Sequence, residues 1–334
     1  MTIDLTVVWA LIIVVAVFIY VVLDGFDLGI GILFRRFEVG PDRDAAMNSI
    51  APVWDGNETW LVLGGGGLLA AFPLAYGLIF SALYAPIVGM LLALVFRGVA
   101  FEFRWRDPAH RGFWDLAFSG GSLLAALCQG IVLGALLQGV AVEGRAYAGG
   151  WWDWLTPFSL VTGVSVVVAY AMLGATWLVM KAEGRLQQQA RTMAWWLGGA
   201  TLTAIVLVSL ATPFLSRAYF DTWLRWPGIL VVAPVPLLVA LASWAFVRSL
   251  RAGHEVAPFL LTLGIFALCF VGLGISVFPD IVPGAVSIWD AATDRSSQVF
   301  MLWGTGLVLP MILAYTGWAY WVFRGKVRAD GYHA

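Results

Sequence analysis

The chain has 334 residues, of which 61% are hydrophobic and only 12% are charged. A soluble domain is about half apolar and about a quarter charged, so this chain lacks the polar surface that a water-soluble globule of its size needs. Its net charge of −1 gives no global field that would attract nucleic acid.

Apolar runs long enough to cross a bilayer follow one another along almost the whole chain. We predict an all-α integral membrane protein with about nine transmembrane helices, which form one polytopic domain over residues 1–334. The pattern is compatible with two four-helix bundles and one peripheral helix. The predicted spans are residues 7–34, 55–72, 77–102, 115–138, 156–180, 194–215, 227–247, 257–279 and 298–323.

The apolar run Leu5–Leu23 has no preceding Arg or Lys and is followed by Asp24 and Asp27 rather than by a small-residue cleavage site. It is therefore expected to be a retained helix and not a signal peptide. The second and third spans are divided only by the weak break at residues 72–77. Residues 35–51 are expected to hold a short amphipathic helix that starts near Pro41.

The distribution of Lys and Arg predicts the orientation of the chain. With nine crossings, 14 of the 19 Lys and Arg residues fall on one side of the membrane, four fall on the other, and Arg97 lies within the third span. Positive residues accumulate on the cytoplasmic side, so the N-terminus is expected outside and the C-terminus inside.

Ionisable residues within the predicted spans are the best candidates for function, because burying a charge in a bilayer is costly. They are confined to the first three spans and to the predicted cytoplasmic half of the membrane. The spacing of Asp24 and Asp27, and of Asp55 and Glu58, places each pair on one helix face. We predict a proton path through carboxylates, with Arg97 as their charge partner. The predicted path residues are Asp24, Asp27, Asp55, Glu58 and Glu102.

A structural interpretation of these charges remains open. Asp55 and Glu58 can instead satisfy the free N–H groups at the start of a helix. Arg97 can likewise be a purely structural partner for Asp24 or Asp27.

Histidine is absent from every predicted span, since His110, His254 and His333 lie in loops or at the tail. Haem in a membrane bundle usually needs an inward-facing His or Met, so this chain is not expected to bind haem, and no metal site is predicted. The two cysteines form no CxxC pair. The run Gly64–Gly67 is expected to permit close helix packing rather than to bind phosphate.

Three sequence blocks resemble subunit II of cytochrome bd-type ubiquinol oxidases. They are LDGFDLGIG from Leu23, NSIAPVWDGNETWL from Asn48 and FRGVAFEFR from Phe96. Their order and spacing, and the hydropathy profile of the whole chain, are similar to that family, and the chain looks like the shorter, cyanide-insensitive type.

The resemblance implies a complex of the bacterial plasma membrane that oxidises ubiquinol or menaquinol and reduces O₂ to water. It implies that haem b and haem d, or haem b in its place, are held by subunit I, which packs against this chain as a pseudo-symmetric heterodimer. Small single-helix subunits, membrane lipids and a structural quinone are further partners that the resemblance allows, although no residue can be named for them.

Within the family, the carboxylate of the Trp-Asp-Gly-Asn block helps to line a proton path, and that residue is Asp55 here. The Asp-Gly-Phe-Asp block supplies a second acidic group, which is Asp24 or Asp27. Glu58 stands where the family is not expected to carry a carboxylate throughout, so its role is expected to be particular to this chain.

The resulting hypothesis is a haem-free subunit, without catalytic residues of its own, that stabilises subunit I and guides protons inward. One alternative is a proton-coupled secondary transporter, which would place charges near the midplane in both halves of a repeat. The charges here lie in one third of the chain, which weighs against a carrier. A purely structural membrane scaffold is the other alternative.

Overall fold

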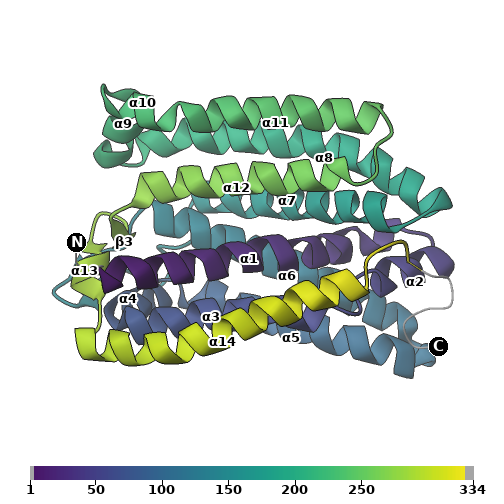
Figure 1. Cartoon of the computed structure of the whole chain (residues 1–334), viewed down its shortest axis with the longest axis horizontal. Coiled ribbons are helices and arrows are strands. Elements are labelled where there is room, and N and C mark those ends of the chain that lie inside the picture. The colour runs from purple at the N-terminus through teal and green to yellow at the C-terminus, as the bar shows by residue number, and fades with distance from the viewer. Residues whose placement is uncertain (1–3, 328–334) are drawn as a thin grey trace.

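The computed structural model describes residues 4–327, and its long elements are all α-helices. They run side by side along one axis, and the start of α1 and the end of α14 lie at opposite ends of the molecule (Figure 1). The long helices are α1 (Leu5–Leu33), α3 (Trp54–Ala71), α5 (Tyr84–Arg106), α6 (Arg111–Leu137), α7 (Pro157–Lys181), α8 (Gly184–Ala211), α11 (Pro234–Arg251), α12 (Ala257–Val277) and α14 (Arg295–Val322).

Short elements join the long helices at both ends of the molecule. They are η1 (Phe34–Arg36), α2 (Pro41–Asn48), α4 (Pro73–Ala82), η2 (Pro108–His110), η3 (Thr212–Phe214), α9 (Arg217–Leu224), α10 (Gly228–Val232) and α13 (Ile288–Ala291). Strands β1 (Val142–Glu143) and β2 (Ala146–Tyr147) form one antiparallel hairpin, and β3 (Asp280–Val282) and β4 (Val286–Ser287) form another. The helix expected near Pro41 is confirmed as α2, with proline in its first turn, where the missing N–H is not needed.

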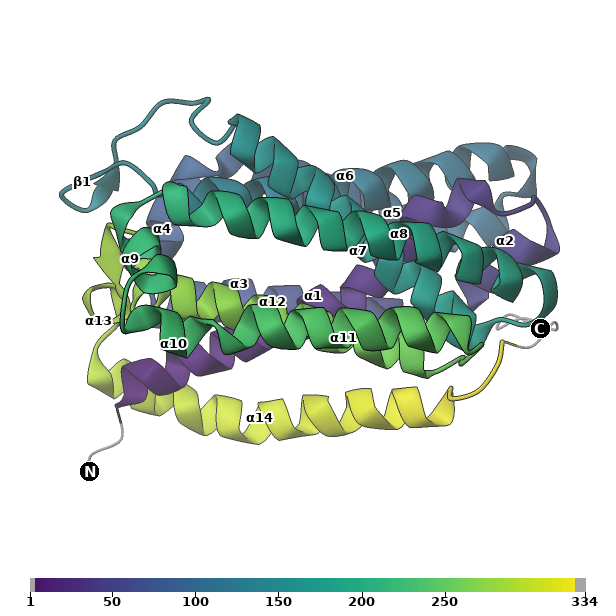
Figure 2. The same cartoon turned by 90° about the horizontal axis from the view of Figure 1, so that it is seen from above.

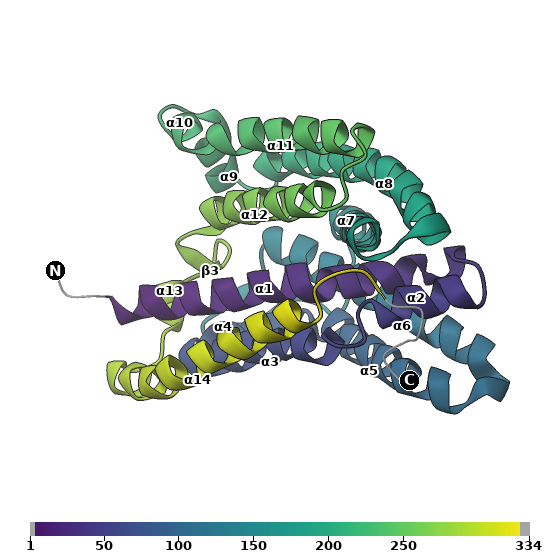
Figure 3. The same ribbon diagram turned by 45° about the vertical axis from the view of Figure 1, so that its right-hand side comes forward.

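The predicted all-α membrane class is confirmed. Within residues 4–327, eight helical segments are each long and apolar enough to cross a membrane, and α3 together with α4 is a ninth candidate that bends by 119°. Figure 3 shows α8, α11 and α12 grouped on one side of the molecule, with α1, α3 and α14 on the other. The division into two four-helix bundles remains a prediction.

The predicted boundaries of the third span are wrong. Residues 73–82 form the separate helix α4, and the spanning helix α5 starts at Tyr84 rather than at residue 77. Pro73 begins α4 after the break at Phe72, and α4 then buries Ala75 and Leu78 in a core with the hairpin residue Val282. An apolar helix that packs on a hairpin has the same composition as a membrane span, so hydropathy alone cannot separate them.

Helices α1 and α7 cross at very close range because glycines lie at the crossing. A Cβ atom on Gly29 would lie 2.8 Å from the backbone nitrogen of Gly174, and one on Gly25 would lie 2.9 Å from the ring of Tyr170. Small residues allow backbones to approach in this way. The crossing fixes the stretch of α1 that carries Asp24 and Asp27.

The glycine run of α3 also packs against α1, as expected. Cβ atoms on Gly64 and Gly67 would lie 3.1 Å and 3.2 Å from Val17 and Ile13, respectively. The two middle glycines of the run face open space. Helices α3 and α7 therefore hold α1 between them.

Replacing Gly29 with Ala should destabilise the chain by about 1–3 kcal/mol, because the added methyl group overlaps the backbone of α7. The matched control is Gly199→Ala in α8, where the new methyl group meets nothing within 4 Å and helix propensity improves. The measurement is the thermal unfolding midpoint of the tagged protein in mild detergent. Equal midpoints for the two variants would contradict the close crossing.

Candidate functional site

The side chain of Arg97 is fully buried inside the molecule and is surrounded by three carboxyl groups. Its Nη1 lies 2.6 Å from Oδ1 of Asp24 and 3.8 Å from Oε2 of Glu58. Its Nη2 lies 3.8 Å from Oδ2 of Asp27. We call these four residues the Arg97 cluster. Because a buried charge is costly without a partner, the cluster ties α1, α3 and α5 to one another.

The helices bring these side chains together for simple geometric reasons. Asp24 and Asp27 are three residues apart and share the face of α1 that the side chain of Arg97 on α5 reaches. The start of α3 is held against α5 by Trp54, whose ring stacks on that of Phe101 with centroids 5.0 Å apart. Glu58, one turn further along α3, then reaches the guanidinium.

Asn57 contacts the same carboxyl oxygen of Asp27 that faces Arg97. Its Nδ2 donates to Oδ2 of Asp27 at 2.8 Å, and its Oδ1 accepts from the hydroxyl of Tyr320 at 2.8 Å. The amide thus presents its N–H to the carboxyl group of Asp27 and its oxygen to the tyrosine hydroxyl. Tyr320 on α14 is thereby connected to the Arg97 cluster.

A second polar chain leads from Asp24 toward α6 and α7. The hydroxyl of Tyr20 interacts with Asp24 and accepts from Nε2 of Gln129 at 2.7 Å. The other end of that amide, Oε1, accepts from the hydroxyl of Tyr170 at 2.8 Å. Neutral polar groups from five helices thus extend the cluster in two directions.

The structure brings together four of the six predicted site residues and leaves two at the surface. Asp24, Asp27 and Arg97 are fully buried, while the Glu58 side chain is 29% exposed. Asp55 is exposed in the first turn of α3, where an acid suits the helix dipole. Glu102 is also exposed and forms an ion pair with Arg106 at 3.6 Å rather than with Arg97.

Sequence reasoning missed Asn57, Tyr20, Gln129 and Tyr320. Each is an uncharged polar residue within a predicted span, which is the signal that could have found them. None carries a charge that forces a partner, and Tyr320 lies 263 residues from Asn57, so no sequence spacing relates the two.

Asp115, the first residue of the predicted fourth span, is buried near the start of α6. This residue of α6 lies 2.6 Å from Nε of Arg104 and 2.6 Å from Nη1 of Arg43. Asp44 of α2 adds a contact of 2.8 Å to Arg104. These residues form a second ionic cluster that fixes α2 against α5 and α6. Charged residues are common at the ends of membrane spans, where they are usually exposed. The sequence therefore gives no sign that the charges of this second cluster are buried.

Near this second cluster, Asp107 lies in the turn between α5 and α6. Its carboxylate accepts a hydrogen bond from Nε1 of Trp114 at 3.2 Å and contacts His110. The Trp114 hydrogen bond, with a smaller contribution from His110, holds the pKa of Asp107 below its ordinary value. The turn therefore carries a stable negative charge.

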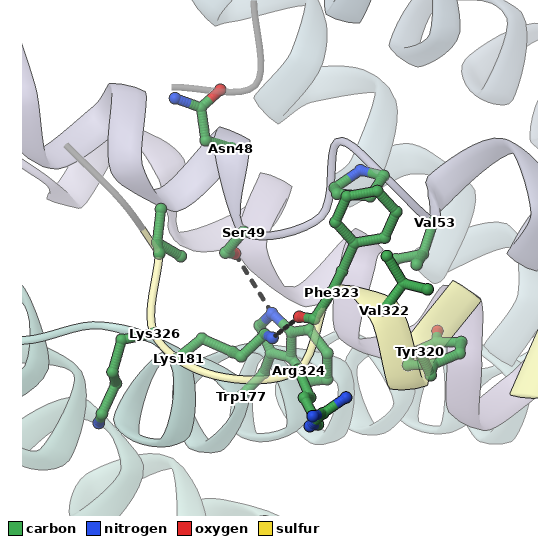
Figure 4. A pocket seen from close by; sticks show the side chains of 12 residues that line it. Asn48, Ser49, Val53, Trp177, Lys181, Tyr320, Val322, Phe323, Arg324 and Lys326 are labelled. Atoms are coloured by element: carbon green, nitrogen blue, oxygen red, sulfur yellow. Dashed lines mark hydrogen bonds between the residues drawn. The ribbon is translucent and has the colours of Figure 1, made fainter. Parts of the chain in front are cut away.

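A pocket of about 390 Å³ opens where the end of α7 meets the end of α14. Figure 4 shows the hydrogen bond from Trp177 to Ser49 and that from Lys181 to the carbonyl oxygen of Phe323. Tyr320 lines this pocket and donates to Asn57, so the pocket adjoins one arm of the Arg97 cluster.

Comparison with known proteins defines the family. The family described as cytochrome bd terminal oxidase subunit II matches residues 5–323. Subunit 2 of cytochrome bd-I ubiquinol oxidase from Escherichia coli K12 is 30% identical, with 97% of this chain and 95% of that protein covered. Subunit 2 of cytochrome bd ubiquinol oxidase from Bacillus subtilis is 29% identical, with 96% of each chain covered.

The fold is also similar to that of a solved protein. A chain from the structure of bd oxidase from Geobacillus thermodenitrificans aligns with a TM-score of 0.79 at 20% identity, over 96% of this chain and 99% of that one. The similarity covers the whole arrangement of spans and not one segment of it.

A multi-pass helical chain with these relatives is a membrane-embedded subunit of an oxygen-reducing quinol oxidase complex. The chain belongs to the cytochrome bd terminal oxidase subunit II family, whose members pair with a subunit I.

Haem belongs to this class of complex, and no histidine among residues 4–327 is buried. Of the three histidines, His110 and His254 are exposed at the ends of helices, and His333 lies outside the described residues. Residues 4–327 also contain no group of three or more His, Cys, Asp or Glu side chains that could hold a metal ion. No step of the chemistry is assigned to this chain through haem.

Replacing Arg97 with Gln should destabilise the chain by about 3–5 kcal/mol, because it leaves buried carboxyl groups without their cation. The matched control is Arg106→Gln on the same helix, whose ion pair is exposed and contributes at most about 1 kcal/mol. Thermal unfolding in mild detergent and the yield of assembled complex are the measurements. An Arg97→Gln protein as stable as the control would show that the buried ion pairs are unimportant.

Proposed function

We propose that this chain stabilises the haem-bearing subunit I and provides a cytoplasmic proton-uptake route to the site of oxygen reduction. In this proposal the electrons come from ubiquinol or menaquinol, and haem b and haem d, or haem b in its place, are bound by the partner. The N-terminus is outside and the C-terminus is cytoplasmic, in keeping with the predicted distribution of Lys and Arg.

The observation that carries the proposal is the imbalance of charge in the Arg97 cluster. One guanidinium faces three carboxyl groups, and two of these are fully buried. If all three were ionised, two negative charges would lie without a cation in a low-dielectric interior. The cluster is therefore expected to retain protons, which a relay must bind and release.

The route is supported by a gradation in exposure. Asp55 is exposed, Glu58 is partly exposed one turn along the same helix, and Asp24 and Asp27 are buried beyond it. Glu102 also lies exposed, next to the Trp54–Phe101 contact at the start of this helix. In the proposed path, Glu102 and Asp55 collect protons at the surface, and Glu58 passes them to the pair beside Arg97.

Asn57 and Tyr320 have a positioning role in this proposal. Their hydrogen bonds hold the carboxyl group of Asp27 in place. An amide is a poor proton carrier, so the proposed transfer passes among carboxyl groups and water and not through Asn57.

Replacing Asp24 with Asn should slow quinol-driven oxygen uptake roughly tenfold or more, because a relay group is lost, while the haem spectrum stays unchanged. The isosteric amide keeps the size of the side chain, so the complex is expected to assemble. The control is Glu143→Gln, an exposed carboxylate in β1 that lies outside the cluster.

The same measurement on Asp55→Asn tests the surface end of the route. Slower turnover with intact haem bands supports proton collection by Asp55. If both Asp24→Asn and Asp55→Asn assemble and turn over normally, the route is rejected and the scaffold alternative is favoured.

A further inference from the structure

The pocket between α7 and α14 contains an ammonium group that lacks an anionic partner. Lys181 is 8% exposed, and its Nζ contacts the carbonyl oxygen of Phe323 and the ring of Trp177, the latter at 5.2 Å from the centroid. No carboxylate within residues 4–327 forms an ion pair with it. A carbonyl oxygen and an aromatic face offset only part of the cost of burying a full charge.

The other charged residues that line the pocket are also positive. Among the described residues, Arg324 and Lys326 also line the pocket, and no Asp or Glu does. Arg324 lies over the ring of Trp321, 4.4 Å from its centroid, and donates to the carbonyl oxygen of the same residue at 2.8 Å. The described part of the lining is therefore cationic.

Lys326 is less available to a bound anion than Lys181 and Arg324 are. Its Nζ lies 2.7 Å from Glu255, which is outside the lining. Hydrogen bonds from Lys326 and Gln187 hold the pKa of Glu255 below its ordinary value. The carboxylate of Glu255 therefore remains ionised and keeps Lys326 in an ion pair. Lys181 and Arg324 are the cations left for an anion.

The remaining wall is built to hold a ligand of mixed polarity. Nε1 of Trp177 donates to the hydroxyl of Ser49 at 3.2 Å, which fixes the indole as an apolar surface beside Lys181 (Figure 4). Val53 and Val322 add aliphatic surface to the same pocket. The pocket thus combines cationic groups with apolar walls.

The position of the pocket indicates what kind of anion it takes. Its walls come from the ends of two candidate spans, α7 at Lys181 and α14 at Val322. This is the boundary between hydrocarbon and water, where basic pockets between transmembrane helices bind anionic headgroups. We propose that the pocket binds a phosphate-bearing anion, with the phosphodiester headgroup of an anionic lipid as its ligand.

The proposal is tested on the whole complex, purified in mild detergent and depleted of lipid. Short-chain phosphatidylglycerol is titrated, and saturable stabilisation against heat gives an apparent Kd. Phosphatidylcholine with the same chains and inorganic phosphate are titrated in parallel. Phosphatidylglycerol is expected to bind most tightly. An equal effect of inorganic phosphate would support the anion site and overturn the lipid as its ligand.

Lys181→Gln should raise the apparent Kd for phosphatidylglycerol about fivefold, because one cation near a headgroup is lost. Arg324→Gln should do the same, and since Arg324 is exposed this variant tests the site even if Lys181→Gln fails to fold. The control is Arg248→Gln, a cation stacked on Trp244 at 5.5 Å outside the pocket. The absence of saturable binding, or an unchanged Kd in both pocket variants, would overturn the proposal.

Discussion

The guanidinium of Arg97 is the constraint on which the arrangement of the first helices depends. An arginine cannot lose its charge in a protein, so burying it obliges the fold to supply anions. Asp24 and Asp27 on α1 and Glu58 on α3 fulfil this need, and their distances from the guanidinium are 2.6 to 3.8 Å. The glycine crossing of α1 with α7 then fixes α1 from its other side.

The peripheral helix α14 depends on the same cluster through Asn57. Figure 2 shows α14 apart from the other long helices along most of its length. Tyr320 anchors it near one end through the Asn57 amide, and near the other end its residue Gln298 accepts through its carbonyl oxygen a hydrogen bond of 3.1 Å from Trp9. Polar contacts at two points thus position a helix that buries little apolar surface.

Much of the fold follows from the sequence, and the exceptions have physical causes. The spans could be predicted because a bilayer requires about 20 apolar residues per helix. Helix α4 could not be separated from a span, because the apolar side chains that it packs against a hairpin give it the composition of a membrane-spanning segment. The site residues that carry a charge within a predicted span, such as Asp24 and Arg97, were predicted as charge partners, and the structure shows them buried and paired. Asn57 and Tyr320 were missed because neutral polar residues do not reveal their partners until the chain is folded.

The sequence also left open whether the acids cap helices or pair with Arg97. Glu58 contacts Arg97, and no side-chain hydrogen bond caps the start of α3, so its role is not that of a simple cap. Asp55 keeps the position expected of a first-turn acid. Asp55 is exposed, whereas Glu58 is partly buried against Arg97. The three-residue spacing of these two acids does not reveal this difference in burial.

A double-mutant cycle between Asp24 and Arg97 tests most directly whether this buried pair governs the structure. The stabilities of Asp24→Asn, Arg97→Gln and the double variant are compared with that of the unaltered complex by thermal unfolding. The account predicts that the double variant loses less stability than the sum of the single losses, with a coupling of about 0.5–3 kcal/mol, because it leaves one buried carboxyl group fewer without a cation than Arg97→Gln alone does. Strictly additive losses would contradict it.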